Sequence, residues 1–284
     1  MKKISSLSGI HTFCDEARSQ GKSLGLVPTM GALHDGHLSL VTLAKRSCDI
    51  IVVSIFVNPT QFAPNEDFSR YPRDLGADLK LCEAAGVTAV FTPEPGEMYP
   101  ERFSTYVSVE QISSVLEGSS RPDHFRGVTT VVAKLFLLTR PHKAFFGQKD
   151  AQQCAVVKKM VKDLNFDVEI VVAPIVREEN GLAMSSRNRY LTKEQRADAA
   201  VLFASLCRAE EMVTGGERDV SKVVAEMTRL IGSKRTAIID YVKVVHSESL
   251  SELTTFDVRV SALVAVAVRF GTTRLIDNTV ITLH

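Results

Sequence analysis

The feature that most constrains the fold is a regular alternation of strand-like and helix-like segments over residues 1–176. Residues 50–57 form an almost continuous run of β-branched and apolar side chains, which is typical of a strand buried on both faces of a sheet. Strands and helices in alternation predict a parallel sheet with right-handed crossover connections. The expected strands begin at Leu24, Asp49, Ala89, Ala144 and Asp167, and the expected helices cover residues 38–46, 74–85, 127–139 and 150–164.

The pattern changes in the rest of the sequence. Thr192 and Gln195 form a capping box at the start of a long amphipathic helix, which Gly215 and Gly216 end. A second helix over residues 220–231 and strand-like runs at 237–245, 258–270 and 273–283 follow. The sequence therefore predicts an α/β protein with a Rossmann-like parallel-sheet domain (residues 1–176) and a smaller C-terminal α+β domain (177–284), which we expect to act as a lid.

Composition and charge narrow the possible partners and locations. The formal net charge is +1, so no overall field attracts nucleic acid or an anionic membrane surface. The five cysteines are scattered without a CxxC pair, which argues against a disulfide framework and a zinc site. The longest apolar stretches are too short to span a bilayer, and the N-terminus lacks the apolar core of a signal peptide. We expect a cytoplasmic protein with no nucleic-acid or membrane partner.

The stretch LVPTMGALHDGHLSLVTLAKR, residues 26–46, joins an apolar strand to an apolar-periodic helix. A helix start offers unpaired N–H groups and a partial positive charge, which together bind anions. Gly31 and Gly36 let the backbone approach a ligand, and His34 and His37 share one face of the first turn. The alternative is an ordinary strand-to-helix turn with incidental histidines. Two histidines with two glycines after a strand favour a phosphate-binding site.

The segment HDGH, residues 34–37, resembles the HxGH signature of the nucleotidyltransferase superfamily, whose members cleave the α–β bond of a nucleoside triphosphate. The longer segment PTMGALHDGH is similar to the pantoate–β-alanine ligase (pantothenate synthetase) family in particular. Further segments agree with that family in the same order, so the resemblance covers essentially the whole chain. They are SIFVNPTQF (54–62), RPDHFRGV (121–128), FGQKDAQQ (146–153), GLAMSSRN (181–188) and RLIDN (274–278).

The resemblance implies an ATP- and Mg²⁺-dependent ligase that condenses (R)-pantoate with β-alanine to pantothenate, a coenzyme A precursor. The implied reaction passes through pantoyl adenylate and releases AMP and pyrophosphate. A carboxylate is already an adequate nucleophile, so the first step needs positioning and charge stabilisation rather than a general base. The resemblance also implies a homodimer.

The same resemblance also implies which residues form the site. Two of these assignments have a structural alternative: residues 184–188 could be an ordinary linker, and Asp150 could be a helix cap. Catalytic roles are implied for His34, His37, Lys149, Ser185, Ser186 and Arg187. ATP contacts are implied for Met30, Gly31, Ala32, Leu33, His34, Asp35, Gly36, His37, Gly147, Gln148, Lys149, Asp150, Val176, Met184, Ser185, Ser186 and Arg187.

The acceptor site is implied to use Met30, Gln61, His124 and Gln153 for pantoate and β-alanine. Asp78 is a candidate for holding Mg²⁺ through water, with a solvated helix face as the alternative. At position 148 many members of the family have Glu, whereas this chain has Gln, which changes the charge beside Lys149.

Two other functions remain open. One is a nucleotidyltransferase of the same superfamily that acts on another small acceptor and stops at nucleotidyl transfer. Such an enzyme would need basic residues for a phosphate-bearing acceptor, whereas Met30, Gln61 and Gln153 suit a small carboxylate. The other is a non-catalytic nucleotide-binding protein, against which the presence of both histidines and Lys149 argues.

Overall fold

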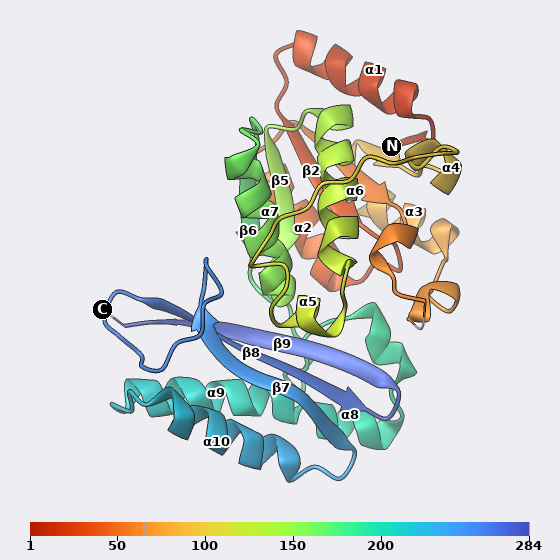
Figure 1. Ribbon diagram of the computed structural model, residues 1–284. Coiled ribbons are helices and arrows are strands. Elements are labelled where there is room, and N and C mark those ends of the chain that lie inside the picture. Colours follow the sequence, from red (N-terminus) through yellow and green to blue (C-terminus); the bar gives the residue numbers. More distant parts are fainter. Residues whose placement is uncertain (65, 284) are drawn as a thin grey trace. The chain divides into compact units, whose positions relative to one another are not determined.

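The computed structural model describes residues 1–64 and 66–283, and the chain divides into two compact units (Figure 1). The first unit comprises Met1–Gly147 and Val156–Pro174. The second comprises Gln148–Ala155 and Ile175–His284. Each unit has its own sheet and its own apolar core, and each is described separately below.

The first unit is built on a six-stranded sheet in the order β1-β4-β3-β2-β5-β6, and all of its pairings are parallel. The central strands are the most apolar, as expected for strands covered by helices on both faces. The strands are β1 (Lys2–Ile4), β2 (Leu24–Thr29), β3 (Ile50–Ile55), β4 (Ala89–Phe91), β5 (Lys143–Gly147) and β6 (Glu169–Ala173). The helices are α1 (Leu7–Ser19), α2 (Asp35–Lys45), α3 (Leu75–Ala84), α4 (Pro95–Met98), α5 (Glu117–Ser120), α6 (His124–Thr139) and the 3-10 helices η1 (Pro59–Gln61) and η2 (Asp67–Ser69).

The strand order locates the binding edge of this sheet. From β2 the chain moves to β3 and β4 on one side, and later to β5 and β6 on the other. Strands β2 and β5 are therefore neighbours at the point where the order reverses. In open parallel sheets, ligands bind beyond the carboxyl ends of the strands at such a point. Strand β2 ends at Thr29 and β5 at Gly147, so the residues after them are site candidates.

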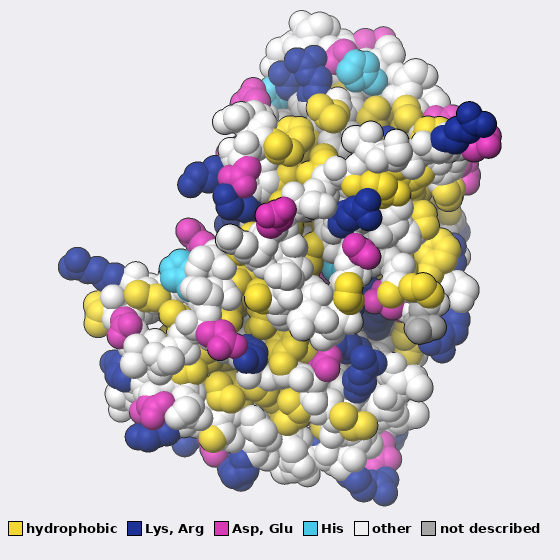
Figure 2. All heavy atoms as spheres, in the orientation of Figure 1, with side chains coloured by type: hydrophobic (Ala, Val, Ile, Leu, Met, Phe, Trp, Pro, Cys, Tyr) yellow, Lys and Arg dark blue, Asp and Glu magenta, His cyan; other side chains and the backbone are white. Residues whose placement is uncertain are grey.

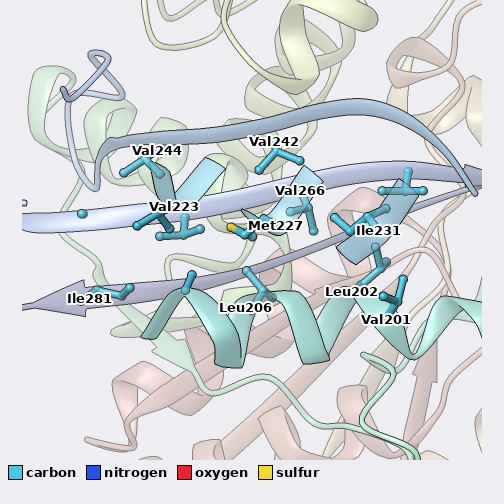
Figure 3. Packing of buried hydrophobic residues seen from close by; sticks show 14 of the residues in the cluster. Val201, Leu202, Leu206, Val223, Met227, Ile231, Val242, Val244, Val266 and Ile281 are labelled. Carbon is cyan, nitrogen blue, oxygen red and sulfur yellow. The ribbon is translucent and has the colours of Figure 1, made fainter. Parts of the chain in front are cut away.

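The second unit is a three-stranded antiparallel sheet covered by helices, with strands in the order β7-β8-β9. Its core packs Leu206, Val223 and Met227 from the helices against Val242 and Val266 from the sheet (Figure 3). The elements are η3 (Gln148–Asp150), η4 (Ser186–Tyr190), α8 (Lys193–Ala199), α9 (Val201–Thr214), α10 (Val220–Gly232), β7 (Ala237–His246), β8 (Ser261–Phe270) and β9 (Thr273–Thr282). Helix α7 (Ala151–Asp163) contributes residues to both units.

The expected fold class, a parallel-sheet unit with a smaller α+β unit, is confirmed. The capping box of Thr192 and Gln195 is present, with Thr192 Oγ1 accepting from Gln195 N at 3.2 Å and Gln195 Oε1 accepting from Thr192 N at 3.0 Å. Some details differ from expectation. Helix α2 begins at Asp35 instead of residue 38, the long helix after Thr192 is divided into α8 and α9, and β1 and α1 were not expected.

The structure also describes the state of the cysteines and the distribution of charge on one face of the surface. All five cysteines are free, and burial raises the pKa of the Cys14 thiol to about 12 and that of Cys82 to about 11, so neither is a ready nucleophile. Figure 2 shows basic and acidic side chains mixed over the visible face. Within residues 1–64 and 66–283, we find no helix that combines the length and apolar character needed to cross a membrane.

Candidate active site

The turn between β2 and α2 is held in an uncommon backbone conformation. Gly31 and Ala32 have φ angles of 82° and 51°, both in the left-handed region. The buried carboxylate of Asp78, 3% exposed, accepts hydrogen bonds from Ala32 N at 2.9 Å and Leu33 N at 2.8 Å. A Cβ on Gly31 would lie 2.9 Å from Asp78 Oδ2 and 3.0 Å from Ile55 Cγ2, so glycine fits both the conformation and the space.

This geometry gives Asp78 a role that differs from the expected one. Both of its carboxylate oxygens are engaged by backbone N–H groups of the β2–α2 turn. Among the described residues, no group of three or more His, Cys, Asp or Glu side chains could hold a metal ion. Each oxygen of Asp78 accepts one backbone hydrogen bond, and the described residues place Asp78 in no acidic cluster, so the contacts that the structure gives this carboxylate are those of a structural brace. Asp78 instead braces the turn that presents the two histidines.

The two histidines lie at the first positions of α2. His34 is the N-cap residue, with an extended backbone, and His37 is the third helical residue. His34 N donates to His37 Nδ1 at 3.4 Å, and the two ring centroids are 4.1 Å apart. Because Nδ1 of His37 accepts this bond, the proton of a neutral His37 ring is on Nε2. A hydrogen-bond donor of this kind beside the positive end of a helix suits a phosphate oxygen.

The neighbouring residues of the turn differ in what they can offer a nucleotide. Asp35 is exposed in the first turn of α2, where its charge complements the helix dipole but repels a phosphate. Gly36 is half-buried, and its carbonyl accepts from Ser39 Oγ at 2.8 Å. The N–H groups of Ala32 and Leu33 are engaged by Asp78. Contacts from these residues to ATP would have to come through other atoms.

Asn58, which the sequence analysis did not single out, fixes the orientation of an expected site residue. It is 1% exposed, and its amide makes four hydrogen bonds. Its Nδ2 donates to Gln61 Oε1 at 3.0 Å and to Gly127 O at 3.1 Å. Its Oδ1 accepts from Thr60 Oγ1 at 3.0 Å and from Tyr99 Oη at 2.7 Å. With every donor and acceptor paired, the Asn58 amide has only one satisfactory orientation.

The orientation of Asn58 determines that of Gln61. Since Gln61 Oε1 accepts from Asn58, its Nε2 is directed toward Met30 Sδ, 3.0 Å away. A thioether is a weak acceptor, so this amide N–H would bind a ligand oxygen more strongly than it binds Met30. The expected acceptor residues Met30 and Gln61 therefore do lie together, and they offer an apolar surface beside a hydrogen-bond donor. That combination suits a small molecule carrying methyl groups and an oxygen.

His124 lies on the other side of Gln61. Its Nδ1 donates to the carbonyl of Gln61 at 2.8 Å, and its Nε2 accepts from Arg121 Nη1 at 3.3 Å. Arg121 also forms a two-bonded ion pair with Glu66, at 2.5 and 2.6 Å. Burial, and then the charge of Arg121, lower the pKa of His124 from 6.5 to about 4. His124 is therefore neutral near pH 7 and contributes a fixed hydrogen bond instead of a charge.

The lowered pKa of His124 predicts a pH-dependent stability. Between the unfolded value of 6.5 and the folded value of about 4, the unfolded chain binds a proton that the folded chain does not. The stabilisation is complete above the unfolded value and is lost as pH falls toward the folded value. We expect acidification from about pH 7 to about pH 5 to lower the unfolding free energy of wild type by on the order of 1 kcal/mol more than that of His124→Gln. Urea titrations at both pH values test this, and parallel losses in the two proteins would contradict it.

The close approach of backbone atoms to Gly127 leads to a second prediction in the same region. A Cβ there would lie 2.4 Å from Thr60 O and 2.6 Å from Gln61 N, which are backbone atoms and cannot rotate away. Gly127→Ala should therefore displace the Gln61 segment, lower the unfolding free energy by about 1–3 kcal/mol and raise the KM for the acceptor substrate. The matched control is Gly232→Ala, whose Cβ would meet no atom within 4 Å. Equal stability and KM in the two variants would refute the close approach.

In the second unit, Lys149 lies in the short helix η3. Its ammonium is 3.6 Å from Asp150 Oδ1, and its side chain is 22% exposed. The backbone around it is tied to β9, because Asn278 Nδ2 donates to Gln148 O at 3.0 Å and to Lys149 O at 2.9 Å. Gln148 Nε2 in turn donates to Asn278 Oδ1 at 3.0 Å. Gln153, half-buried, follows on α7.

Asp277, next to Asn278, holds the start of the segment that leads to Ser185. It is 2% exposed and pairs with both terminal nitrogens of Arg177, at 2.6 and 3.1 Å. Burial raises the pKa of the Asp277 carboxyl, and Arg177 and Lys149 partly offset this rise. Arg177 also donates to Gly181 O at 3.0 Å, and Val176 O accepts from Met184 N at 2.9 Å. These bonds fix a narrow hairpin immediately before Ser185.

The expected phosphate-binding segment itself forms the short helix η4. Ser185 is its N-cap, and Arg187 N donates to Ser185 Oγ at 3.2 Å. Asn188 Nδ2 donates to Glu178 Oε1 at 2.8 Å, while Arg196 contacts both Glu178 and Asn188 O. Ser186 is buried, and Arg187 is half-buried. The segment is thus a braced turn and not an unstructured linker.

In the structure, the expected site residues form separate groups. Met30, Gln61 and His124 are joined by direct hydrogen bonds within the first unit, and the histidine pair follows Met30 on the same turn. Lys149 and the segment 184–187 lie in the second unit. The sequence analysis gave no role to four residues that brace these groups: Asn58, Tyr99, Asp277 and Asn278. Asn58, Asp277 and Asn278 were within quoted motifs, but only the folded contacts reveal what their side chains bind.

Comparison with known proteins decides the family. A family model described as Pantoate-beta-alanine ligase matches residues 2–280. The chain belongs to the pantoate–β-alanine ligase family. The pantothenate synthetase of Acetivibrio thermocellus is 56% identical over 281 residues, which cover 99% of each chain. That of Geobacter sulfurreducens is 52% identical, with the same coverage.

Solved structures of pantoate–β-alanine ligases have the same fold. The pantothenate synthetase of Thermus thermophilus superimposes with a TM-score of 0.92 at 44% identity, covering 98% of this chain and 99% of the other. The pantoate–β-alanine ligase of Francisella tularensis, complexed with Beta-gamma ATP and β-alanine, superimposes with a TM-score of 0.81 at 32% identity, covering 98% and 97%. The ligase expected from the sequence motifs is thereby confirmed, and the two alternative functions are set aside.

Proposed function

We propose that this chain condenses (R)-pantoate with β-alanine at the expense of ATP, in two steps. In the first, a carboxylate oxygen of pantoate attacks the α-phosphorus, the bond to the α–β bridging oxygen breaks, and pyrophosphate leaves. In the second, the amine of β-alanine attacks the acyl carbon, AMP leaves, and pantothenate is formed. The observation that carries this proposal is the adjacent pair of rings of His34 and His37, inclined by 35°, at the start of α2, in a chain matched to the family almost end to end.

For the first step, the proposal assigns charge stabilisation to His34, His37 and Lys149. Negative charge increases on the α-phosphate and the bridging oxygen as the bond breaks, and preorganised donors are most effective against such charge. Because His37 Nδ1 accepts a hydrogen bond from His34 N, the neutral ring carries its proton on Nε2, where it can be donated to a phosphate oxygen. Lys149 supplies a compact positive charge. Ser185, Ser186 and Arg187 are proposed to bind phosphate oxygens through hydroxyl and guanidinium groups.

For the acceptor, the proposal assigns Met30 to the methyl groups of pantoate and Gln61 Nε2 to one of its oxygens. Gln61 is supported in this role by Asn58, which leaves its N–H as the group presented beside Met30. His124 is proposed to remain neutral and to hold the Gln61 backbone. Gln153 is proposed to contact pantoate, on the family resemblance alone.

The remaining expectations stay proposals. We take Mg²⁺ to enter as MgATP, held by the phosphates, and no step is assigned to a protein-bound metal. The remaining expected ATP contacts and the homodimer rest on the sequence resemblance. The domain boundary at residues 176 and 177 rests on the change of sequence pattern, and the cytoplasmic location rests on composition. Size-exclusion chromatography with light scattering would test the dimer.

The direct test of the proposed function is product formation from defined substrates. Purified protein with MgATP should release AMP only when pantoate and β-alanine are both present, with pantothenate formed in equal amount. AMP or pyrophosphate release that continues with an unrelated acceptor, or no release at all, would overturn the assignment.

A further inference from the structure

A carboxylate of the chain itself is bound to the cation that borders the acceptor residues. Glu66 accepts hydrogen bonds from Arg121 Nε at 2.5 Å and from Arg121 Nη2 at 2.6 Å. Two parallel bonds from one guanidinium are the geometry in which arginine recognises a carboxylate, whether that carboxylate belongs to the chain or to a ligand. The side chains of Arg121 and Glu66 are 19% and 20% exposed, so a solute can reach this pair from solvent.

The guanidinium of Arg121 is also held by groups other than Glu66. Its Nη1 donates to His124 Nε2 at 3.3 Å, and its Nη2 donates to Gln61 O at 3.3 Å. Its backbone is fixed as well, because Arg121 N donates to Glu117 O at 2.9 Å and Arg121 O accepts from His124 N at 3.1 Å. Arg121 is therefore a preorganised receptor, which loses little freedom when a carboxylate binds to it.

Glu66 is easier to displace than Arg121. It lies between η1 and η2, where its backbone N donates to Ala63 O at 3.0 Å. Glu66 is the N-cap residue of η2, but its carboxylate is directed at Arg121. Exchange of this carboxylate for one from a ligand leaves the charge at Arg121 balanced. It therefore avoids the large cost of leaving a partly buried guanidinium unpaired.

The second step of the proposed reaction needs a carboxylate receptor close to Gln61. Only two carbon atoms separate the amine of β-alanine from its carboxylate. The amine has to reach the acyl carbon of the pantoyl group that the proposed function places at Met30 and Gln61. The cation that binds the β-alanine carboxylate must therefore lie beside these residues. Arg121 meets this requirement, because it donates to the Gln61 carbonyl.

We propose that the carboxylate of β-alanine displaces Glu66 from Arg121, so that Glu66 is an internal competitor that sets the affinity for this substrate. The inference rests on the proposed function, since it takes β-alanine as the second substrate. A carboxylate tethered to the same chain competes at an effective concentration on the order of millimolar. Glu66 also keeps other carboxylates, such as that of a second pantoate molecule, from occupying Arg121.

The first test replaces Glu66 by its neutral isostere. In Glu66→Gln we expect the KM for β-alanine to fall by about 3–10-fold, because the tethered competitor has lost its charge. Propionate, a carboxylate without an amine, should inhibit competitively against β-alanine, and its inhibition constant should fall in the same ratio. Pantoate-dependent ATP–pyrophosphate exchange, which reports the first step, should stay at the wild-type level.

The matched control for this test is Glu194→Gln. It breaks another glutamate–arginine pair, with Arg235 at 2.7 Å, in the second unit. Both the KM for β-alanine and the inhibition constant of propionate should remain at their wild-type values in this variant.

The second test removes the receptor without leaving an unpaired charge. In the double variant Arg121→Gln, Glu66→Gln, we expect kcat/KM for β-alanine to be about 10–100-fold lower than in Glu66→Gln alone. Hydroxylamine is a nucleophile without a carboxylate, and it converts an acyl adenylate to a hydroxamate. Its rate of reaction should be equal in the two variants, because it makes no use of Arg121.

Three results would count against these proposals in different ways. An unchanged or raised KM for β-alanine in Glu66→Gln would overturn the competition by Glu66. Equal losses with β-alanine and hydroxylamine in the double variant would show that Arg121 only supports the fold of the site, and would overturn its role as receptor. Absence of pantoate-dependent exchange in wild type would instead contradict the proposed function itself.

Discussion

Replacing His37 by alanine is expected to slow the formation of pantoyl adenylate by about 10²–10³-fold, with the fold intact. His37 accepts a bond from His34 N through Nδ1, which leaves Nε2–H as a donor at the positive end of α2. Such a donor is valuable only when negative charge increases on a phosphate oxygen. Stability should therefore change little, since the remaining bonds of the first turn are made by backbone atoms.

Pyrophosphate release in a single turnover, followed with the melting temperature, measures this effect. His34→Ala should show a similar rate loss with an additional loss of stability, because His34 is also the N-cap residue. The matched control is His11→Ala. His11 is an exposed histidine that pairs with Asp15 in α1, and neither residue belongs to the β2–α2 turn. Wild-type pyrophosphate release by His37→Ala would contradict the assigned role.

Replacing Asp78 by alanine is expected to lower the unfolding free energy by about 3 kcal/mol. The change leaves the N–H groups of Ala32 and Leu33 without their acceptor in a buried turn, where Ala32 also has a positive φ. Adenylate formation should fall as well, because this turn leads directly into His34. The matched control is Asp74→Ala, which removes the N-cap of the same helix α3 and should cost about 1 kcal/mol with activity retained.

The Asp78→Ala variant also distinguishes a bracing role of Asp78 from a role in metal binding. If Asp78 only braces the turn, the Mg²⁺ concentration needed for half-maximal activity should be equal in Asp78→Ala and wild type. A metal ligand would give the opposite result, with normal stability and a raised Mg²⁺ requirement. Denaturant titration and a magnesium titration of the residual activity measure the two quantities on one preparation.

Much of the fold could be predicted because its strands are strongly apolar and its helices begin with recognisable caps. Residues 50–57 indicated a buried central strand, and the structure has β3 there, completely buried over its first five residues. β1 and α1 were missed because β1 has three residues and the polar N-terminal segment shows little apolar pattern. The buried positions of α1, Ile10, Cys14 and Ala17, are few, although they have helical spacing.

The sequence predicted the histidine pair of the candidate site but not the hydrogen bonds that brace it, for a physical reason. The histidine pair is local in sequence, so its spacing alone places both rings on one turn. The bracing bonds join residues far apart in the chain: Asp78 binds Ala32, and Asn278 binds Lys149. No spacing rule predicts which buried amide or carboxylate will reach a given backbone group. Asp78 illustrates this, since its position in a helix suggested a solvated face while its carboxylate is enclosed.

The central claim, that an acyl adenylate forms before the amine reacts, is tested most directly by a single-turnover acid quench. Enzyme is mixed with MgATP and pantoate, β-alanine is withheld, and enzyme-bound pantoyl adenylate and pyrophosphate are measured. The account predicts that both appear in amounts approaching the number of active sites, and that β-alanine added afterwards converts the adenylate to pantothenate and AMP. If neither species appears until β-alanine is present, while full turnover then proceeds, the two-step account is contradicted.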